Sequence, residues 1–76
     1  MKRYQNLSGT SGVIAYEVGD DSSIAVQFTD GSVYLYNTTS TSAYNISQMQ
    51  RLAAAGKGLS SFISRVVRDH YVTRLR

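Results

Sequence analysis

The residues that could carry out catalysis are few and scattered in this sequence. The chain has no cysteine and a single histidine, His70, so it lacks a thiol nucleophile and the ligand set of a zinc site. Asp69 precedes His70, but neighbouring positions on a helix point about 100° apart, so the two side chains do not pair. The serines have no base and no residue to orient one. We therefore expect no enzymatic activity, no metal and no cofactor, and we interpret His70 as a surface residue.

Two further stretches contain residue types found in active sites, but each fits a structural role better. Asp20 and Asp21 lie in GDDSS, a composition typical of turns, and they have no partner at helical spacing. In AAAGKGLSS, Gly58 follows Lys57 where a phosphate-binding loop has Ser or Thr, and the stretch follows a predicted helix where that motif needs a strand. We interpret it as a turn between helices. Lys57 at its tip could still contact phosphate, because the amides that begin the next helix lie nearby.

Charge is the strongest functional signal in the sequence. Residues 1–38 carry a net charge of −2 and residues 39–76 carry +5. The cations of the second half are Arg51, Lys57, Arg65, Arg68, Arg74 and Arg76. A basic half predicts an acidic partner, most commonly nucleic acid, although a solvated charged face gives the same pattern. Arg65 and Arg68 are three residues apart and share an exposed helix face, from which arginines can bind phosphate in a bidentate way.

The length of 76 residues predicts one domain, with frayed ends at about 1–10 and 72–76. The first residues are basic, but no apolar run of a secretory signal follows them, and no stretch is apolar enough to span a membrane. We expect a cytoplasmic protein with no membrane partner.

Three short β-prone runs come first in the chain, and they predict an antiparallel meander. They are VIAYEV (13–18), IAVQFT (24–29) and SVYLYN (32–37). Asp30-Gly31 between the last two is a hairpin signal that requires a positive φ at Gly31.

The turn at Gly31 decides where Tyr34 and Tyr36 point. In a two-residue loop, Val26 faces Leu35, and both tyrosines lie on the solvent face as a stacking platform for unpaired bases. In a three-residue loop with a bulge at Gly31, Val26 faces Tyr34, and both tyrosines lie on the core side. One residue of slip moves every side chain to the other face, so both arrangements stay open at this point.

Helical spacing begins after residue 42. AYNISQMQRLAAA (43–55) predicts a helix that begins after the polar run TTSTS and ends at Gly56. A second helix is predicted from an apolar stripe whose spacing buries Phe62 and Val67. The stripe consists of Leu59, Phe62, Ile63, Val66 and Val67. The order βββαα predicts an α+β fold of two layers, in which a three-stranded meander is covered by a helical hairpin.

Several of these residues resemble the motifs of the KTSC domain, a short domain named for the C-terminus of some lysyl-tRNA synthetases and also found as small bacterial proteins. The Tyr-x-Tyr of that family is matched by Tyr34-Leu35-Tyr36, and its later signature by Phe62, Ile63, Ser64, Val67, Arg68 and Tyr71. The resemblance covers residues 11–71. The residue between the two tyrosines is often polar in that family, which implies buried tyrosines and the bulged turn. The family's function is unknown, and RNA binding has been proposed for it.

The sequence therefore predicts a small non-catalytic binding module, with RNA as the leading partner. The candidate phosphate-binding residues are Arg51, Lys57, Arg65, Arg68 and Arg74, with Tyr34 and Tyr36 as stacking residues if they are exposed. The alternative is a protein-interaction or structural module that acts through its sheet edge or its helical face.

Overall fold

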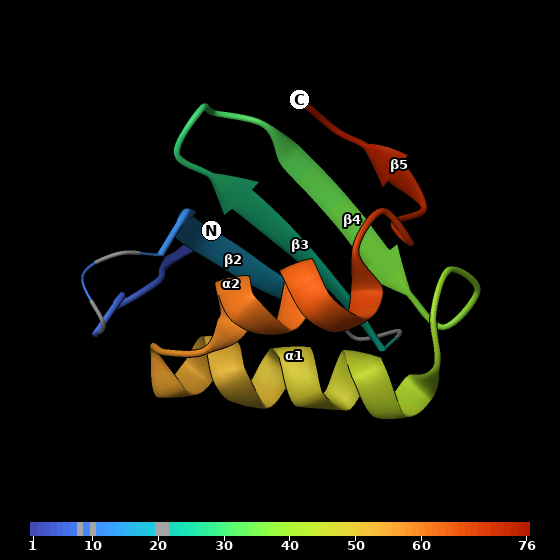
Figure 1. Cartoon of the computed structure of the whole chain (residues 1–76). Coiled ribbons are helices and arrows are strands. Elements are labelled where there is room, and N and C mark those ends of the chain that lie inside the picture. The colour runs from blue at the N-terminus through green and yellow to red at the C-terminus, as the bar shows by residue number, and fades with distance from the viewer. Residues whose placement is uncertain (8, 10, 20–21) are drawn as a thin grey trace.

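One antiparallel sheet carries two helices on one of its faces (Figure 1). The computed structural model describes residues 1–7, 9, 11–19 and 22–76, and all element bounds refer to these residues. The strands are β1 (Lys2–Arg3), β2 (Val13–Gly19), β3 (Ser23–Phe28), β4 (Val33–Asn37) and β5 (Thr73–Arg74), paired in that order. The helical elements are α1 (Ala43–Ala55), α2 (Leu59–Phe62) and a π-helical segment, η1 (Ile63–Val67).

The α+β class is confirmed, but the sheet has five strands where three were expected. The turn residues Asp20 and Asp21 lie outside the described residues.

The two additional strands lie at the edges of the sheet, where the chain ends were expected to fray. β1 pairs with β2, and the Tyr4 N–H then donates to the Ile14 carbonyl at 2.9 Å. β5 pairs with β4, and the Leu75 N–H donates to the Val33 carbonyl at 2.7 Å. The outer edges of β2 and β4 would otherwise present unpaired backbone groups, and these hydrogen bonds satisfy part of them.

The hairpin between β3 and β4 has the three-residue turn. The Gly31 N–H donates to the Phe28 carbonyl and the Phe28 N–H to the Ser32 carbonyl, each at 2.9 Å. Gly31 has a φ of +89°, which confirms the positive φ expected there. Val26 consequently pairs with Tyr34, and the bulged register is the one that the structure shows.

Helix α1 has the bounds that the sequence predicts, because its signals are local. The Ser42 hydroxyl accepts a hydrogen bond from the Asn45 N–H at 3.1 Å and so caps the first turn. Gly56 ends the helix in the left-handed region, with a φ of +79°. The buried face consists of Ile46, Met49 and Ala53.

The second helix changes its pitch, which corrects part of the predicted apolar stripe. After one turn of α2, the Arg68 N–H donates to the Ile63 carbonyl five residues earlier, at 2.6 Å, which is the π-helical pattern. Val67 is fully buried, as expected, but Val66 is 43% exposed. Phe62, expected to be buried, is only partly so and packs against the edge of the core. The wider turn rotates Val66 away from the sheet, because each π turn uses more residues than an α turn.

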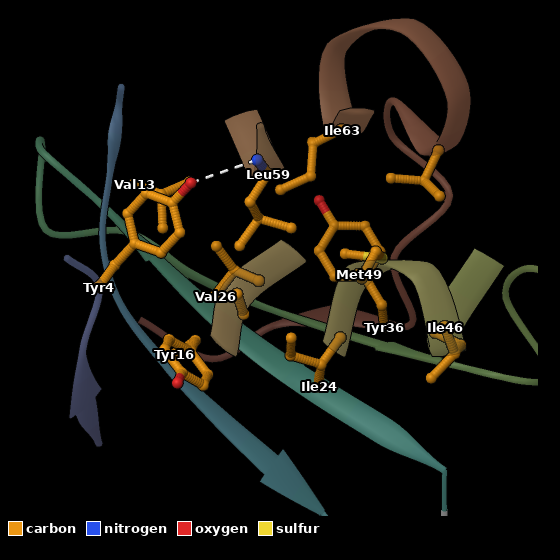
Figure 2. Packing of buried hydrophobic residues seen from close by; sticks show 12 residues of the cluster. Tyr4, Val13, Tyr16, Ile24, Val26, Tyr36, Ile46, Met49, Leu59 and Ile63 are labelled. Carbon is orange, nitrogen blue, oxygen red and sulfur yellow. Dashed lines mark hydrogen bonds between the residues drawn. The ribbon is translucent and has the colours of Figure 1, made fainter. Parts of the chain in front are cut away.

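The core lies between the helices and one face of the sheet (Figure 2). Tyr4 is part of it, although it belongs to the segment expected to fray. Its hydroxyl accepts a hydrogen bond from the Leu59 N–H at 3.3 Å, drawn as the dashed line in Figure 2. The other fully buried large side chains are Val13, Ile24, Val26, Tyr36, Ile46, Met49, Leu59 and Val67. In the part of the chain that the structure describes, the opposite face of the sheet carries no helix (Figure 1).

Candidate nucleic-acid interface

Three tyrosines meet where η1 leads into β5, and we call Tyr34, Tyr36 and Tyr71 the tyrosine cluster. The ring centres of Tyr34 and Tyr71 are 4.5 Å apart with the planes tilted by 50°. Tyr36 meets Tyr71 edge to face at 6.2 Å. Phe28 supports the other side of Tyr34, edge to face at 5.8 Å. These are distances at which aromatic rings attract each other.

The backbone on both sides of Tyr71 fixes its position on the cluster. Before it, the His70 N–H donates to the Val67 carbonyl at 2.7 Å and closes a tight turn. After it, the Val72 N–H donates to the Leu35 carbonyl at 2.6 Å and joins the chain to the edge of β4. The ring of Tyr71 is therefore held over Tyr34 by hydrogen bonds that do not involve its own side chain.

The structure does not offer Tyr34 and Tyr36 as an open stacking platform. Tyr36 is 2% exposed and belongs to the core. Tyr34 is half-buried, and its ring is enclosed by Phe28, Tyr71 and the Arg74 guanidinium, which lies 5.7 Å from the ring centre. Both residues were candidates for stacking only if exposed, and the bulged register places them on the helix-covered face.

Burial also changes the acidity of Tyr36. Its removal from water raises the pKa of Tyr36 to about 12, and the neighbouring Tyr34, Tyr71 and Asp69 add to the rise. The phenol is therefore neutral at physiological pH and acts as a core side chain with a polar tip.

Arg65 and Arg68 are both exposed, but they do not share one helix face as expected, because Arg65 lies within η1 and Arg68 follows its last residue with non-helical angles. Arg68 has a φ of +45° and a ψ of −119° at the end of η1. These angles match the second residue of a type II′ turn across Val67 to His70, a position normally taken by glycine. A strained backbone position of this kind costs about 1–3 kcal/mol. The strain presents the Arg68 side chain to solvent, three residues before Tyr71.

Arg74 is the candidate cation that directly contacts the tyrosine cluster. It pairs with Tyr34 across β4 and β5, and its guanidinium lies over that ring. Its Nε donates to the Arg76 carbonyl at 2.9 Å, which orients the side chain along the sheet edge.

The charge of Arg74 also acts on Asp30. The pKa of Asp30 is lowered, chiefly by hydrogen bonds from Ser32 and in smaller part by the charge of Arg74.

The two remaining candidates lie elsewhere in the fold. Arg51 is exposed on α1, and its guanidinium donates to the Gln48 side chain at 2.5 Å. Lys57 is exposed in the turn between α1 and α2. Across the described part of the chain, no hydrogen bond, ion pair or ring contact joins either residue to the tyrosine cluster. The structure therefore brings Tyr34, Tyr36 and Arg74 together, with Arg68 close along the chain.

Tyr71 belongs to the tyrosine cluster, but it is not among the candidate binding residues that the sequence indicates. The sequence places it on the same side as Val67, but helical periodicity alone does not bring it to β4. The feature of the sequence that points to Tyr71 is the resemblance to KTSC domains, because Tyr71 is the last residue of the Arg-x-x-Tyr pattern. The contact depends on the turn at Arg68 and on β5, and neither has a periodic signature.

Potential metal-ligating side chains do not gather anywhere among the residues that the structure describes. These residues contain no group of three or more His, Cys, Asp or Glu side chains placed to hold an ion. A hollow of about 450 Å³ lies at the other edge of the sheet and is lined by Met1, Lys2, Tyr16, Glu17, Val18, Gln50 and Ala54. Within the described ranges, no helix has the length and apolar character needed to cross a membrane.

Comparison of the chain with protein-family models, with curated proteins and with solved structures found no match. The resemblance to KTSC domains therefore rests on the short motifs of the sequence.

Proposed function

We propose that this chain is a small non-catalytic binding module that binds RNA through the cations of its second half. The contacts would be made to phosphates, and Arg65, Arg68 and Arg74 would form the centre of the surface. The resemblance to KTSC domains, for which RNA binding has been proposed, supports the same class of partner.

One observation carries the proposal: the positive charge of this half is exposed and lacks acidic partners in contact. All six of its Lys and Arg side chains are exposed. Among the described residues, the ion pair that forms is the one between the N-terminal amine and Glu17, at 3.8 Å, in the other half of the chain. A cation that makes no ion pair within the protein can bind phosphate without first breaking one.

The strain at Arg68 supports the same conclusion. A glycine at this position would form the turn without strain, yet the chain has an arginine whose side chain reaches into solvent. Strained backbone positions cluster at functional sites, and here the strained residue is one of the candidate phosphate ligands.

A protein-binding module is the second candidate, and a specific surface favours it. Val18 is exposed near the end of β2 and lines the hollow at this edge of the sheet. β1 pairs only with Ala15 and Tyr16, so the edge combines apolar surface with backbone groups of β2 that β1 does not cover. An extended segment of another protein could add to such an edge.

A salt titration separates the two functions. We expect the wild-type chain to bind a short single-stranded RNA at low salt and to lose affinity steeply as salt rises, since phosphate contacts release counterions. Replacing Arg65→Gln and Arg68→Gln together should reduce the slope of log affinity against log salt by about 0.7 for each phosphate that the variant no longer binds. The matched control is Lys2→Gln with Arg3→Gln, which removes the same charge from β1 and should leave the slope unchanged.

Two outcomes would contradict the proposal. Absence of RNA binding by the wild-type chain at low salt would reject nucleic acid as the partner and favour the protein-binding module. Equal losses of affinity in the two double variants would show that only the total charge matters and that the second half has no special surface.

A further inference from the structure

Tyr71 differs from every other aromatic residue near the cations of the second half. It is 37% exposed, although one side of its ring lies against Tyr34. Tyr36 meets it edge to face, so the ring rests on aromatic side chains that belong to the core or pack against it. A ring that is fixed from beneath and open to solvent loses little side-chain freedom when a flat ligand covers it.

We propose that Tyr71 stacks an unpaired base and that the nucleic acid bound by this protein is single-stranded. The inference rests on the proposed RNA-binding function and names the class of strand that the site accepts. It transfers the stacking role from Tyr34 and Tyr36, which the fold encloses, to the residue that covers them.

The cations on both sides of Tyr71 fit a nucleic-acid strand that crosses its ring. Arg68 stands three residues before it in the tight turn, with its side chain exposed. Arg74 stands three residues after it, with its guanidinium over the neighbouring Tyr34. A base on Tyr71 would therefore have arginines close by along the chain that could bind the phosphates next to it. An aromatic ring between cations is the usual composition of a single-strand site.

The most exposed tyrosine, Tyr44, lacks these features. It is 70% exposed near the start of α1, but no aromatic ring or cation among the described residues contacts its ring. The first cation after it on α1 is Arg51, about two helical turns away. Tyr44 therefore offers exposed area without support or flanking charge and serves as a matched control for Tyr71.

A duplex could use the arginines but not the tyrosine. In a double helix the faces of the bases are stacked on each other, and only phosphates, sugars and base edges are accessible. Phosphate contacts alone would hold both forms, and the duplex somewhat more strongly because its charge density is higher. Preference for the single strand is consequently the property that stacking on Tyr71 would add.

The test measures fluorescence anisotropy with two probes, a labelled oligouridylate and the same strand paired with oligoadenylate. We expect the wild-type chain to prefer the unpaired strand. Tyr71→Leu keeps apolar cover over Tyr34 but removes the stacking surface, and it should weaken single-strand binding by roughly fivefold or more. Its salt slope should stay at the wild-type value, because stacking releases no counterions. Tyr71→Phe and Tyr44→Leu should both bind the single strand like the wild type.

A second measurement does not depend on a variant that folds. Ultraviolet crosslinking of the wild-type chain to a thiouridine-containing strand, followed by mass spectrometry, should place the crosslink at Tyr71. Crosslinks at Tyr44, or at tyrosines outside the cluster, would overturn the inference.

The failure of this inference and that of the proposed function look different. Equal binding of the duplex and the single strand, or wild-type affinity in a folded Tyr71→Leu variant, overturns the stacking role while the arginines still bind phosphate. Absence of binding to both probes at low salt overturns both proposals together.

Discussion

The hydroxyl of Tyr4 accepts a hydrogen bond from the backbone N–H of Leu59 at 3.3 Å, across 55 positions of the chain. This bond connects the segment after β1 to the first turn of α2, where a helix has N–H groups without partners of their own. Because the bond is buried, Tyr4→Phe leaves that N–H unsatisfied and should lower the free energy of unfolding by about 1–3 kcal/mol. Urea denaturation measures the change.

The control for this experiment is Tyr16→Phe. Tyr16 is also buried in the core, but its hydroxyl makes no hydrogen bond to another described side chain or backbone group. Its removal should change stability by less than about 0.5 kcal/mol. Equal losses of stability in the two variants would show that the Tyr4 hydrogen bond contributes nothing beyond the packing of its ring.

The π-helical segment predicts that the same substitution destabilises the fold by different amounts at two adjacent valines. Val67→Ala removes a fully buried side chain and should cost about 2 kcal/mol, whereas Val66→Ala removes one that faces solvent and should cost less than about 0.5 kcal/mol. Thermal melting of the two variants measures the difference. A regular α-helix at this position would bury both residues and would destabilise both variants alike.

The raised pKa of Tyr36 predicts a loss of stability at alkaline pH. The unfolded chain releases this phenolic proton at a pH of about 10, and burial raises the pKa of Tyr36 to about 12 in the folded chain. Stability from this group is therefore complete below pH 10 and is lost as the pH rises to about 12. Urea titrations across this range should show a smaller loss for Tyr36→Phe than for the wild type. The exposed Tyr44→Phe should retain the wild-type loss.

The strain at Arg68 predicts that a glycine there stabilises the fold and weakens binding. Arg68→Gly should raise the free energy of unfolding by about 1 kcal/mol, since glycine adopts a φ of +45° freely. In a domain of this size that gain corresponds to about 4–8 °C in melting temperature. Affinity for single-stranded RNA should fall, because the variant has no guanidinium at this position. Arg65→Gly within η1 provides the contrast, and we expect it to be destabilising by about 1 kcal/mol.

A lower melting temperature for Arg68→Gly would show that the turn is not strained. A higher melting temperature with unchanged RNA affinity would show that the strain has no connection with binding.

The parts of the fold that the sequence predicts are those with local signals. Helix α1 has a cap at Ser42, a periodic apolar face and a terminating Gly56, and it forms with the predicted bounds. The hairpin has its Asp-Gly pair, but that pair allows two registers, and the sequence alone left the choice open. The choice depends on which face the helices cover, which is a tertiary property.

The parts that were missed are those without local signals. β1 and β5 have two residues each, too few to show an alternating pattern, and they form because β2 and β4 offer unpaired edges. The widened turn at η1 follows the same apolar sequence that an α-helix would, so periodicity placed Val66 in the core. The role of Tyr71 requires both features, and its contact with Tyr34 could not be derived from spacing.

The short strands at the two edges of the sheet also affect how this protein meets other copies of itself. A sheet that ends in a long apolar edge invites another sheet to pair with it, which is a common start of aggregation. Here each edge ends in a two-residue strand that carries a basic side chain, Lys2 and Arg3 on one side and Arg74 on the other. Copies approaching edge to edge would therefore meet like charges. The arginine that lies over Tyr34 would thus also oppose fibril-like pairing at this edge.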